Sequence, residues 1–92
     1  MIVSFKCRDT EAMFIGKRIG RFTGIEAVAM RKLALLNVAE RIEDLRAPPG
    51  NRLEALKGKR QGQWSIRIND QWRICFRFKG GSAADVEIVD YH

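Results

Sequence analysis

The hydrophobic pattern of this chain changes its period at Pro48-Pro49-Gly50. Before that point apolar residues recur at helical spacing, and after it they alternate with polar residues. One face of a helix repeats about every 3.6 residues, whereas one face of a strand repeats every two residues. Proline followed by glycine ends a helix, because proline has no backbone N–H to donate. The sequence therefore predicts an α+β fold, with helices in the first half packed on a sheet from the second half.

The clearest helix is predicted over Ile25–Ala39. Apolar residues there recur at i, i+3, i+4 and i+7, and Lys32 interrupts the stripe. Ile42 and Leu45 continue the same spacing, which predicts a second helical piece before the prolines.

A further short helix is predicted over Glu11–Ile15. Asp9 or Thr10 can cap its start, because a side-chain oxygen at that position accepts a bond from a free backbone N–H. Gly16 can end it. The basic, glycine-rich stretch Gly16–Gly24 is predicted to be a loop.

Two further short strands are predicted. Ile2–Lys6 alternates apolar and polar residues, with Val3 and Phe5 on one face. Leu53 and Leu56 are predicted to begin an edge strand.

Strong alternation continues through the rest of the chain and predicts a curved antiparallel sheet with one buried face. The apolar members of this pattern are Trp64, Ile66, Ile68, Trp72, Ile74, Phe76, Phe78, Val86 and Ile88. The turn between the first two of these strands is predicted at Asn69-Asp70-Gln71. A three-residue turn pairs Ile68 with Trp72 and keeps the apolar face continuous, whereas a two-residue turn pairs Asn69 with Trp72.

The same register places Arg67 directly opposite Arg73 on the polar face. Like charges in opposed positions destabilise a sheet. One interpretation is that both arginines bind a shared anion such as a phosphate. The other is that the two side chains splay apart into water.

Positive charge is concentrated between Arg52 and Lys79. This segment holds eight of the 17 basic residues and two of the 11 acidic residues, so it carries the whole formal net charge of +6. A cationic face on a small domain is typical of a protein that binds a polyanion. The predicted phosphate contacts are Lys57, Lys59, Arg60, Arg67, Arg73 and Arg77.

Length and composition predict one domain over residues 1–92. The apolar runs are too short to span a membrane, and the N-terminus lacks the pattern of a signal peptide, so we expect a cytoplasmic protein with no membrane contact. Two cysteines and one histidine do not make up a closed zinc site. We expect free thiols, no metal and no cofactor.

The C-terminal Tyr91-His92 pair adds groups that can transfer protons. Strand parity allows Tyr91 to lie on the arginine face. Cleavage of RNA without a metal needs a base for the 2′-hydroxyl proton, an acid for the leaving 5′-oxygen and cations for the phosphate. His92 exchanges protons near neutral pH and can serve as either acid or base. Glu54 can be a base or an orienting group, or it can form a surface ion pair with Arg52 or Lys57.

Several motifs resemble the HigB branch of the RelE/ParE toxin superfamily, and among its members the GraT-type HigB toxins most. The opening residues and the Ile25–Ala39 helix also fit this family in place and length. The motifs are Leu53–Gly58, Gly62–Ile68, Gln71–Phe76 and Asp90-Tyr91-His92.

The resemblance implies a RelE-like fold and a toxin that cleaves mRNA in the ribosomal A site. It also implies a HigA-like antitoxin with a helix-turn-helix fold, and binding of the complex to its own operator DNA. Some relatives carry a histidine where this chain has Glu54, and a carboxylate there supplies no positive charge. The family's phosphate-binding and catalytic positions correspond here to Lys57, Arg73, Asp90, Tyr91 and His92.

Three functional hypotheses follow from these observations. The first is a ribosome-dependent, metal-independent endoribonuclease. The second is a module that binds RNA or the ribosome through its basic face without catalysis. The third is a protein-binding domain whose basic face docks an acidic antitoxin.

Overall fold

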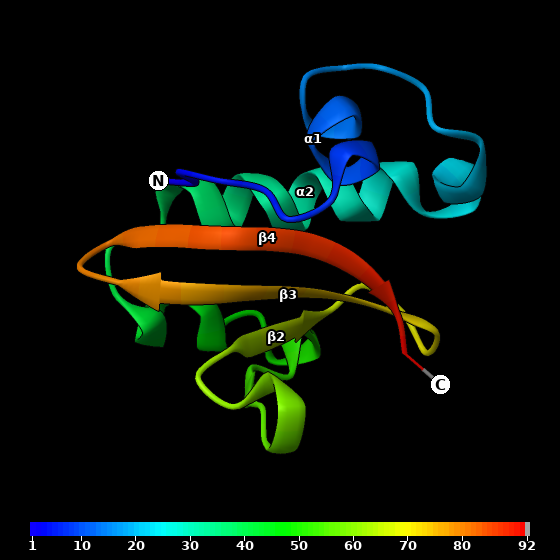
Figure 1. Cartoon of the computed structure of the whole chain (residues 1–92). Helices are drawn as coiled ribbons and strands as arrows, with labels where there is room; N and C mark the ends of the chain where they lie inside the picture. Colours follow the sequence, from blue (N-terminus) through cyan, green and yellow to red (C-terminus); the bar gives the residue numbers. More distant parts are fainter. Residues whose placement is uncertain (92) are drawn as a thin grey trace.

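The predicted antiparallel sheet is present in the structure, a computed structural model that describes residues 1–91. Its four strands lie in the order β1-β2-β3-β4, and each pairs with its neighbour in antiparallel fashion (Figure 1). The strands are β1 (Glu54–Ala55), β2 (Trp64–Arg67), β3 (Trp72–Lys79) and β4 (Ser82–Asp90).

The register predicted from side-chain parity is confirmed. Ile66 pairs with Ile74 and Trp64 with Phe76. The backbone N–H of Ile68 donates to the carbonyl of Trp72 at 2.9 Å, so the turn has three residues. The apolar side chains of β2 and β3 therefore lie on the same face of the sheet along the whole length of β2.

The two helices, α1 (Arg8–Phe14) and α2 (Glu26–Val38), lie together on one face of the sheet (Figure 1). The prediction for the longer helix is confirmed to within one residue at each end. Its stripe and the apolar face of the sheet bury one core, and Trp72 packs edge-on against Phe22 with ring centroids 5.6 Å apart. Fully buried members include Phe22, Leu33, Leu36, Ile66, Ile74 and Phe76.

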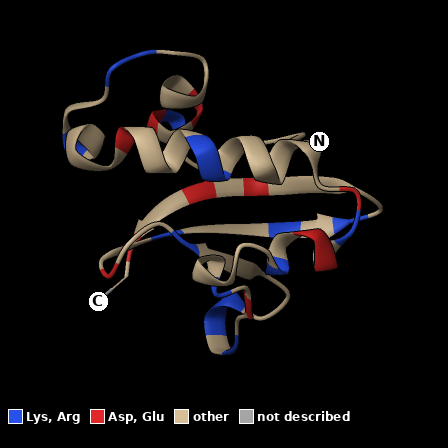
Figure 2. Ribbon diagram, turned by 180° about the vertical axis from the view of Figure 1, so that it is seen from behind, with Lys and Arg blue, Asp and Glu red and all other residues tan. Residues whose placement is uncertain are grey.

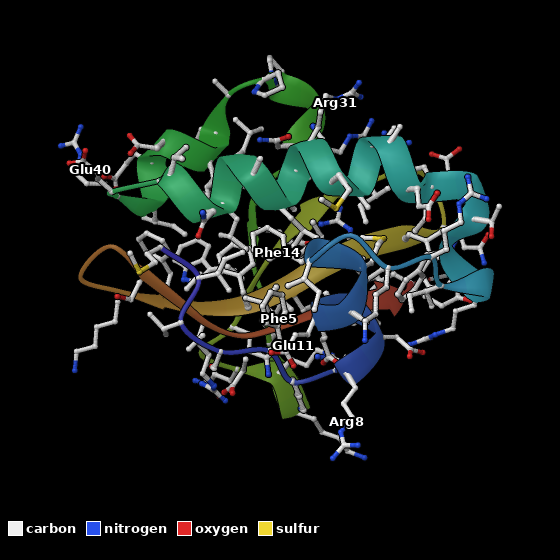
Figure 3. The ribbon with its side chains drawn as sticks, turned by 90° about the horizontal axis from the view of Figure 1, so that it is seen from above. Phe5, Arg8, Glu11, Phe14, Arg31 and Glu40 are labelled. Atoms are coloured by element: carbon white, nitrogen blue, oxygen red, sulfur yellow. The ribbon has the colours of Figure 1, made fainter. Side chains whose placement is uncertain are left out.

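The N-terminal segment was predicted as a strand over Ile2–Lys6, but it forms two isolated parallel bridges to β4, at Ile2 and at Phe5. β4 has a β-bulge around Asp85, whose φ is +53°. The bulge breaks the regular spacing of backbone groups along β4, so the N-terminal segment cannot form a continuous hydrogen-bond ladder with it. Val3 is exposed, whereas Phe5 packs on Phe14 of α1 (Figure 3).

The start of the first helix was also predicted wrongly, because α1 begins at Arg8 and not at Glu11. Neither predicted capping residue caps it. The hydroxyl of Thr10 accepts a hydrogen bond from the backbone N–H of Ile88 on β4 at 3.0 Å, and Asp9 forms an ion pair with Arg21.

The segment between the helices is more ordered than predicted. The loop expected over Gly16–Gly24 contains most of a 3₁₀ helix, Gly20–Ile25, whose Phe22 is buried in the core. Gly16 follows α1 with a φ of +101°, a conformation that glycine adopts without strain.

The predicted second helical piece is a 3₁₀ helix, Ile42–Arg46, with Leu45 in the core. Its start is held by Asp44, whose carboxylate accepts the backbone N–H groups of Glu40 and Arg41 at 3.0 and 3.1 Å. These bonds hold the pKa of Asp44 below its ordinary value of 3.8.

We expect Asp44 to contribute to the acid sensitivity of the fold. A carboxyl whose pKa is lowered by folding stabilises the native state above its unfolded pKa, and the contribution is lost as the pH falls through the folded value. Asp44→Asn should therefore lower stability at pH 7 and change it little near pH 2. Urea unfolding of both proteins at the two pH values measures this, and an equal loss at both would contradict it.

The sheet was predicted to have one buried face, but the centre of its second face is buried as well. Ser65 and Cys75 on that face have no exposed surface. They lie beneath residues 56–63, here called the 56–63 turn, which contains the 3₁₀ helix Gly58–Arg60 and is closed by a bond from the N–H of Leu56 to the carbonyl of Gln63. Figure 1 shows this turn on the side of the sheet opposite α1 and α2.

Within the described range, no helix combines the length and apolar character needed to cross a membrane.

Candidate functional site

Arg73 is the centre of the site on the polar face of the sheet. Its guanidinium nitrogen Nη1 donates to the Ser65 hydroxyl at 2.6 Å and to the carbonyl of Arg52 at 3.4 Å. The same nitrogen lies 3.5 Å from a carboxylate oxygen of Glu54, and 16% of the side chain is exposed. A guanidinium is always charged and presents several donors in a fixed plane. Arg73 is therefore a preorganised cation with one side open.

Tyr91 lies beside the guanidinium of Arg73. The guanidinium carbon of Arg73 lies 5.7 Å from the centre of the Tyr91 ring, within the range of a cation–π contact. The backbone N–H of Tyr91 donates to the carbonyl of Gln71 at 2.5 Å, which fixes the end of β4 beside the start of β3. Tyr91 is 38% exposed, so it lies at the surface of the site.

The predicted opposition of Arg67 and Arg73 is confirmed, and each side chain lies beside a carboxylate of its own. Arg67 pairs with Asp70, and Arg73 pairs with Glu54. The carboxylates remove the repulsion that the pairing alone would cause. Glu54 thus pairs with Arg73 and with neither Arg52 nor Lys57.

The other residues of the predicted set are distributed around this centre. Lys57 and Lys59 are exposed on the 56–63 turn, and neither forms an ion pair with another residue of the range 1–91. Asp90 is exposed and accepts a bond from the Gln71 amide at 3.1 Å. His92 lies outside the described residues. Figure 2 shows the basic residues on β3 and on the turn below it.

Arg60, which is also among the predicted phosphate contacts, holds the 56–63 turn on the sheet. Its Nη1 lies 2.9 Å from the carboxylate of Glu87 on β4, and the same nitrogen donates to the Gln63 side chain. The hydrogen bond that Arg60 donates to Glu87 raises the pKa of the Arg60 guanidinium. Beneath this pair, burial raises the pKa of the Cys75 thiol, which therefore stays protonated.

We expect Glu87→Gln to lower the free energy of unfolding by about 1 kcal/mol, because it removes the charge from a partly buried bond. The matched control is Glu43→Gln, whose ion pair with Arg41 is 4.0 Å long and more than half exposed. That control should change stability by less than about 0.5 kcal/mol. Urea unfolding of both variants compares them, and equal losses would show that the Arg60–Glu87 pair has no special role.

Sequence reasoning missed two residues that orient the site, Ser65 and Glu87. Both pair with Cys75, from opposite sides of β3. Strand parity places Ser65 and Glu87 on the same face of the sheet as the arginines, one on each strand next to β3. A polar residue at such a central position is the sequence feature that could have identified both.

The profile of the HigB-like toxin family, described as "RelE-like toxin of type II toxin-antitoxin system HigB", matches residues 17–92. This chain belongs to the HigB-like toxin family. Membership of a toxin–antitoxin system implies an antitoxin partner.

Curated relatives agree with this membership along most of the chain. "Toxin HigB-1" of Vibrio cholerae is 39% identical over 85 residues, which cover 90% of each chain. "Endoribonuclease HigB" of Proteus vulgaris is 33% identical over 96 residues, which cover 100% of each.

Solved structures support the RelE/YoeB-like fold of this HigB-like toxin. The match to a chain of the YoeB-YefM toxin–antitoxin complex from Staphylococcus aureus has a TM-score of 0.58 at 14% identity and covers 100% of this chain and 98% of that chain. The match to the YoeB/ParE toxin from Agrobacterium tumefaciens has a TM-score of 0.51 at 21% identity and covers 99% and 96%. At these identities the likeness concerns the fold alone.

Proposed function

We propose that this HigB-like toxin is a ribosome-dependent endoribonuclease that cleaves mRNA in the ribosomal A site and stops translation. The observation that carries the proposal is the Arg73 cation, which is fixed by Ser65 and lies beside the Tyr91 ring. The full-length similarity to the Proteus vulgaris endoribonuclease supports it.

The proposed reaction is a transesterification at one phosphate of the RNA. The 2′-oxygen of the RNA attacks the adjacent phosphorus, and the bond from phosphorus to the 5′-oxygen breaks. A base takes the 2′-hydroxyl proton, and an acid returns a proton to the leaving 5′-oxygen. Lys57 and Arg73 stabilise the negative charge that develops on the phosphate.

Proton transfer is assigned to the groups around the end of β4. Tyr91 and His92 are proposed as the transferring groups, with Glu54 as a base or as the group that orients Arg73. Asp90 is proposed to support the C-terminal residues. Arg67, Arg77, Lys59 and Arg60 are proposed to contact RNA phosphates farther from the cut, and Arg60 also positions the 56–63 turn.

The proposed biological setting follows from the same resemblance. The antitoxin is a HigA-like protein with a helix-turn-helix fold, and the complex binds operator DNA through that antitoxin. The chain is proposed to be cytoplasmic and to belong to the GraT type of HigB toxin.

The test is primer extension on a defined message in a purified translation system. Wild type, Tyr91→Phe and His92→Ala are compared, without a C-terminal tag that would displace His92. New cuts that require ribosomes and disappear in the folded variants are expected. Undiminished cutting by both variants would disprove the assignment of the protons to these two residues.

A second candidate function is binding without cleavage, which the exposed Lys57 and Lys59 favour. It predicts inhibition of translation without cuts, and loss of inhibition in Lys57→Ala but not in Tyr91→Phe. A third candidate is antitoxin docking by the basic face alone, which predicts neither cuts nor inhibition.

A further inference from the structure

A basic hollow lies on the polar face of the sheet, beside the β3–β4 hairpin. It has a volume of about 460 Å³, and its basic members are Arg77 and Lys79 of β3. The rest of its lining is formed by Gly62, Phe78, Ser82 and Ala84. Arg73 and Arg77 are four residues apart on β3, or roughly 13 Å along the strand. The hollow is therefore separate from the Arg73 site.

The 56–63 turn keeps the two basic sites apart. The Arg60–Glu87 pair fixes this turn over Cys75, which lies midway between Arg73 and Arg77 on β3. Each site thus opens on its own side of the turn, while both remain on the same face of the sheet. A single phosphate cannot contact both arginines, but one extended polyanion can.

An ion pair with Asp85 positions Arg77 in this hollow. Its Nε lies 3.5 Å from the carboxylate of Asp85. Asp85 has a φ of +53° at the β-bulge, an uncommon conformation for a residue other than glycine, and its N–H donates to the Ser4 hydroxyl at 2.9 Å. Backbone strain of this kind persists where surrounding contacts hold it, and it is concentrated at functional sites.

Gly62 provides the space for the other end of the same guanidinium. A Cβ placed on Gly62 would lie 2.8 Å from Nη1 of Arg77, and the residue has a φ of +92°. Any other residue at this position would displace Arg77 and strain the turn. Because Asp85 lies at the Nε side, the remaining nitrogen donors of Arg77 are available to a ligand.

We propose that this hollow is a second phosphate-binding site, which holds the backbone of the RNA strand at a distance from the cleavage site. Arg77 donates to the phosphate oxygens, and Lys79 supplies a second charge from the same side of β3. An RNA backbone is favoured because this site shares its face with Arg73, Tyr91 and the exposed lysines of the turn. The proposal deepens the proposed function, since both sites would bind one RNA.

Binding is tested separately from cleavage, with a labelled single-stranded RNA and fluorescence anisotropy over a range of salt concentrations. Arg77→Ala and Lys79→Ala should each weaken binding, Arg77→Ala by about tenfold. Each lost phosphate contact should reduce the slope of log K against log salt by about 0.7. Lys17→Ala removes an exposed lysine from the helical layer and should leave affinity and slope unchanged.

Arg77→Lys serves as the variant that keeps the charge, and it should retain the salt slope while losing part of the affinity. Circular dichroism and urea unfolding show whether each variant is folded. Unchanged RNA affinity and slope in folded Arg77→Ala and Lys79→Ala would overturn the inference, even if the protein cleaves mRNA. So would a loss of antitoxin binding in these variants with RNA binding intact, since the hollow would then bind a protein.

Cleavage provides the second measurement. The Arg77 and Lys79 variants should require more substrate for half-maximal cleavage on the ribosome, with an unchanged rate at saturation. If wild type shows no cleavage but the anisotropy results are as expected, the second site stands and the proposed catalytic function fails.

Discussion

Arg73→Ala will lower the rate of ribosome-dependent mRNA cleavage by a factor of about 100 to 1,000. Arg73 is the cation fixed beside Tyr91 and Ser65, and removal of one preorganised donor from a developing negative charge commonly has an effect of this size. Single-turnover primer extension measures the rate. Arg73→Lys should retain part of the activity, because it keeps the charge but loses the planar set of donors.

The control for this prediction is Arg41→Ala, which removes an exposed arginine that also lies near a carboxylate, at 4.0 Å from Glu43. Its cleavage rate should match that of wild type. Arg73 is largely buried, so urea unfolding must show that the Arg73 variants remain folded during the assay. A folded Arg73→Ala that cleaves at the wild-type rate would remove Arg73 from the reaction.

Phe76→Ala will have the largest effect on stability, a loss of about 3–5 kcal/mol in the free energy of unfolding. Phe76 has no exposed surface, pairs with Trp64 across the sheet and packs on Phe78 with ring centroids 6.4 Å apart. Its removal leaves a cavity in the single core cluster. Domains of this size are stabilised by about 5–15 kcal/mol, so the variant should be unfolded in part at 37 °C.

Val38→Ala is the matched control, because Val38 is an apolar residue of α2 that is 72% exposed. It should change the free energy of unfolding by less than about 0.5 kcal/mol. Equilibrium urea unfolding of both variants tests the pair of predictions. A loss below 1.5 kcal/mol for Phe76→Ala would show that the core closes around the cavity.

Side-chain parity was sufficient to predict the part of the site that lies on regular strands. Pairing apolar with apolar residues required Ile66 opposite Ile74, and this register places Arg67 opposite Arg73. The same alternation, continued along β4, brought Tyr91 to the arginine face. Successive side chains of a strand point to opposite faces of the sheet. The register that pairs the apolar residues therefore also pairs the polar residues between them, and it predicted contacts that the polar residues alone would not have indicated.

The 56–63 turn could not be predicted in this way, because its residues have no regular period. Its position depends on Arg60 and Glu87, which are 27 residues apart in the sequence. A contact between two such residues depends on tertiary packing and leaves no local pattern. The same is true of the hydroxyl of Thr10, which was expected to cap α1 and instead bonds to the backbone of β4.

The two outer edges of the sheet have a consequence for inhibition by an antitoxin. Along β4, the N–H groups of Ala83 and Val86 already donate to Met1 and Ser4, and that of Ile88 donates to Thr10. At the opposite edge, β1 is two residues long. A peptide that binds by β-augmentation needs a row of free backbone groups on an edge strand. An antitoxin segment that added to β4 as a further strand would first have to displace residues 1–6. An antitoxin that instead contacts the side chains of the toxin leaves the toxin fold intact.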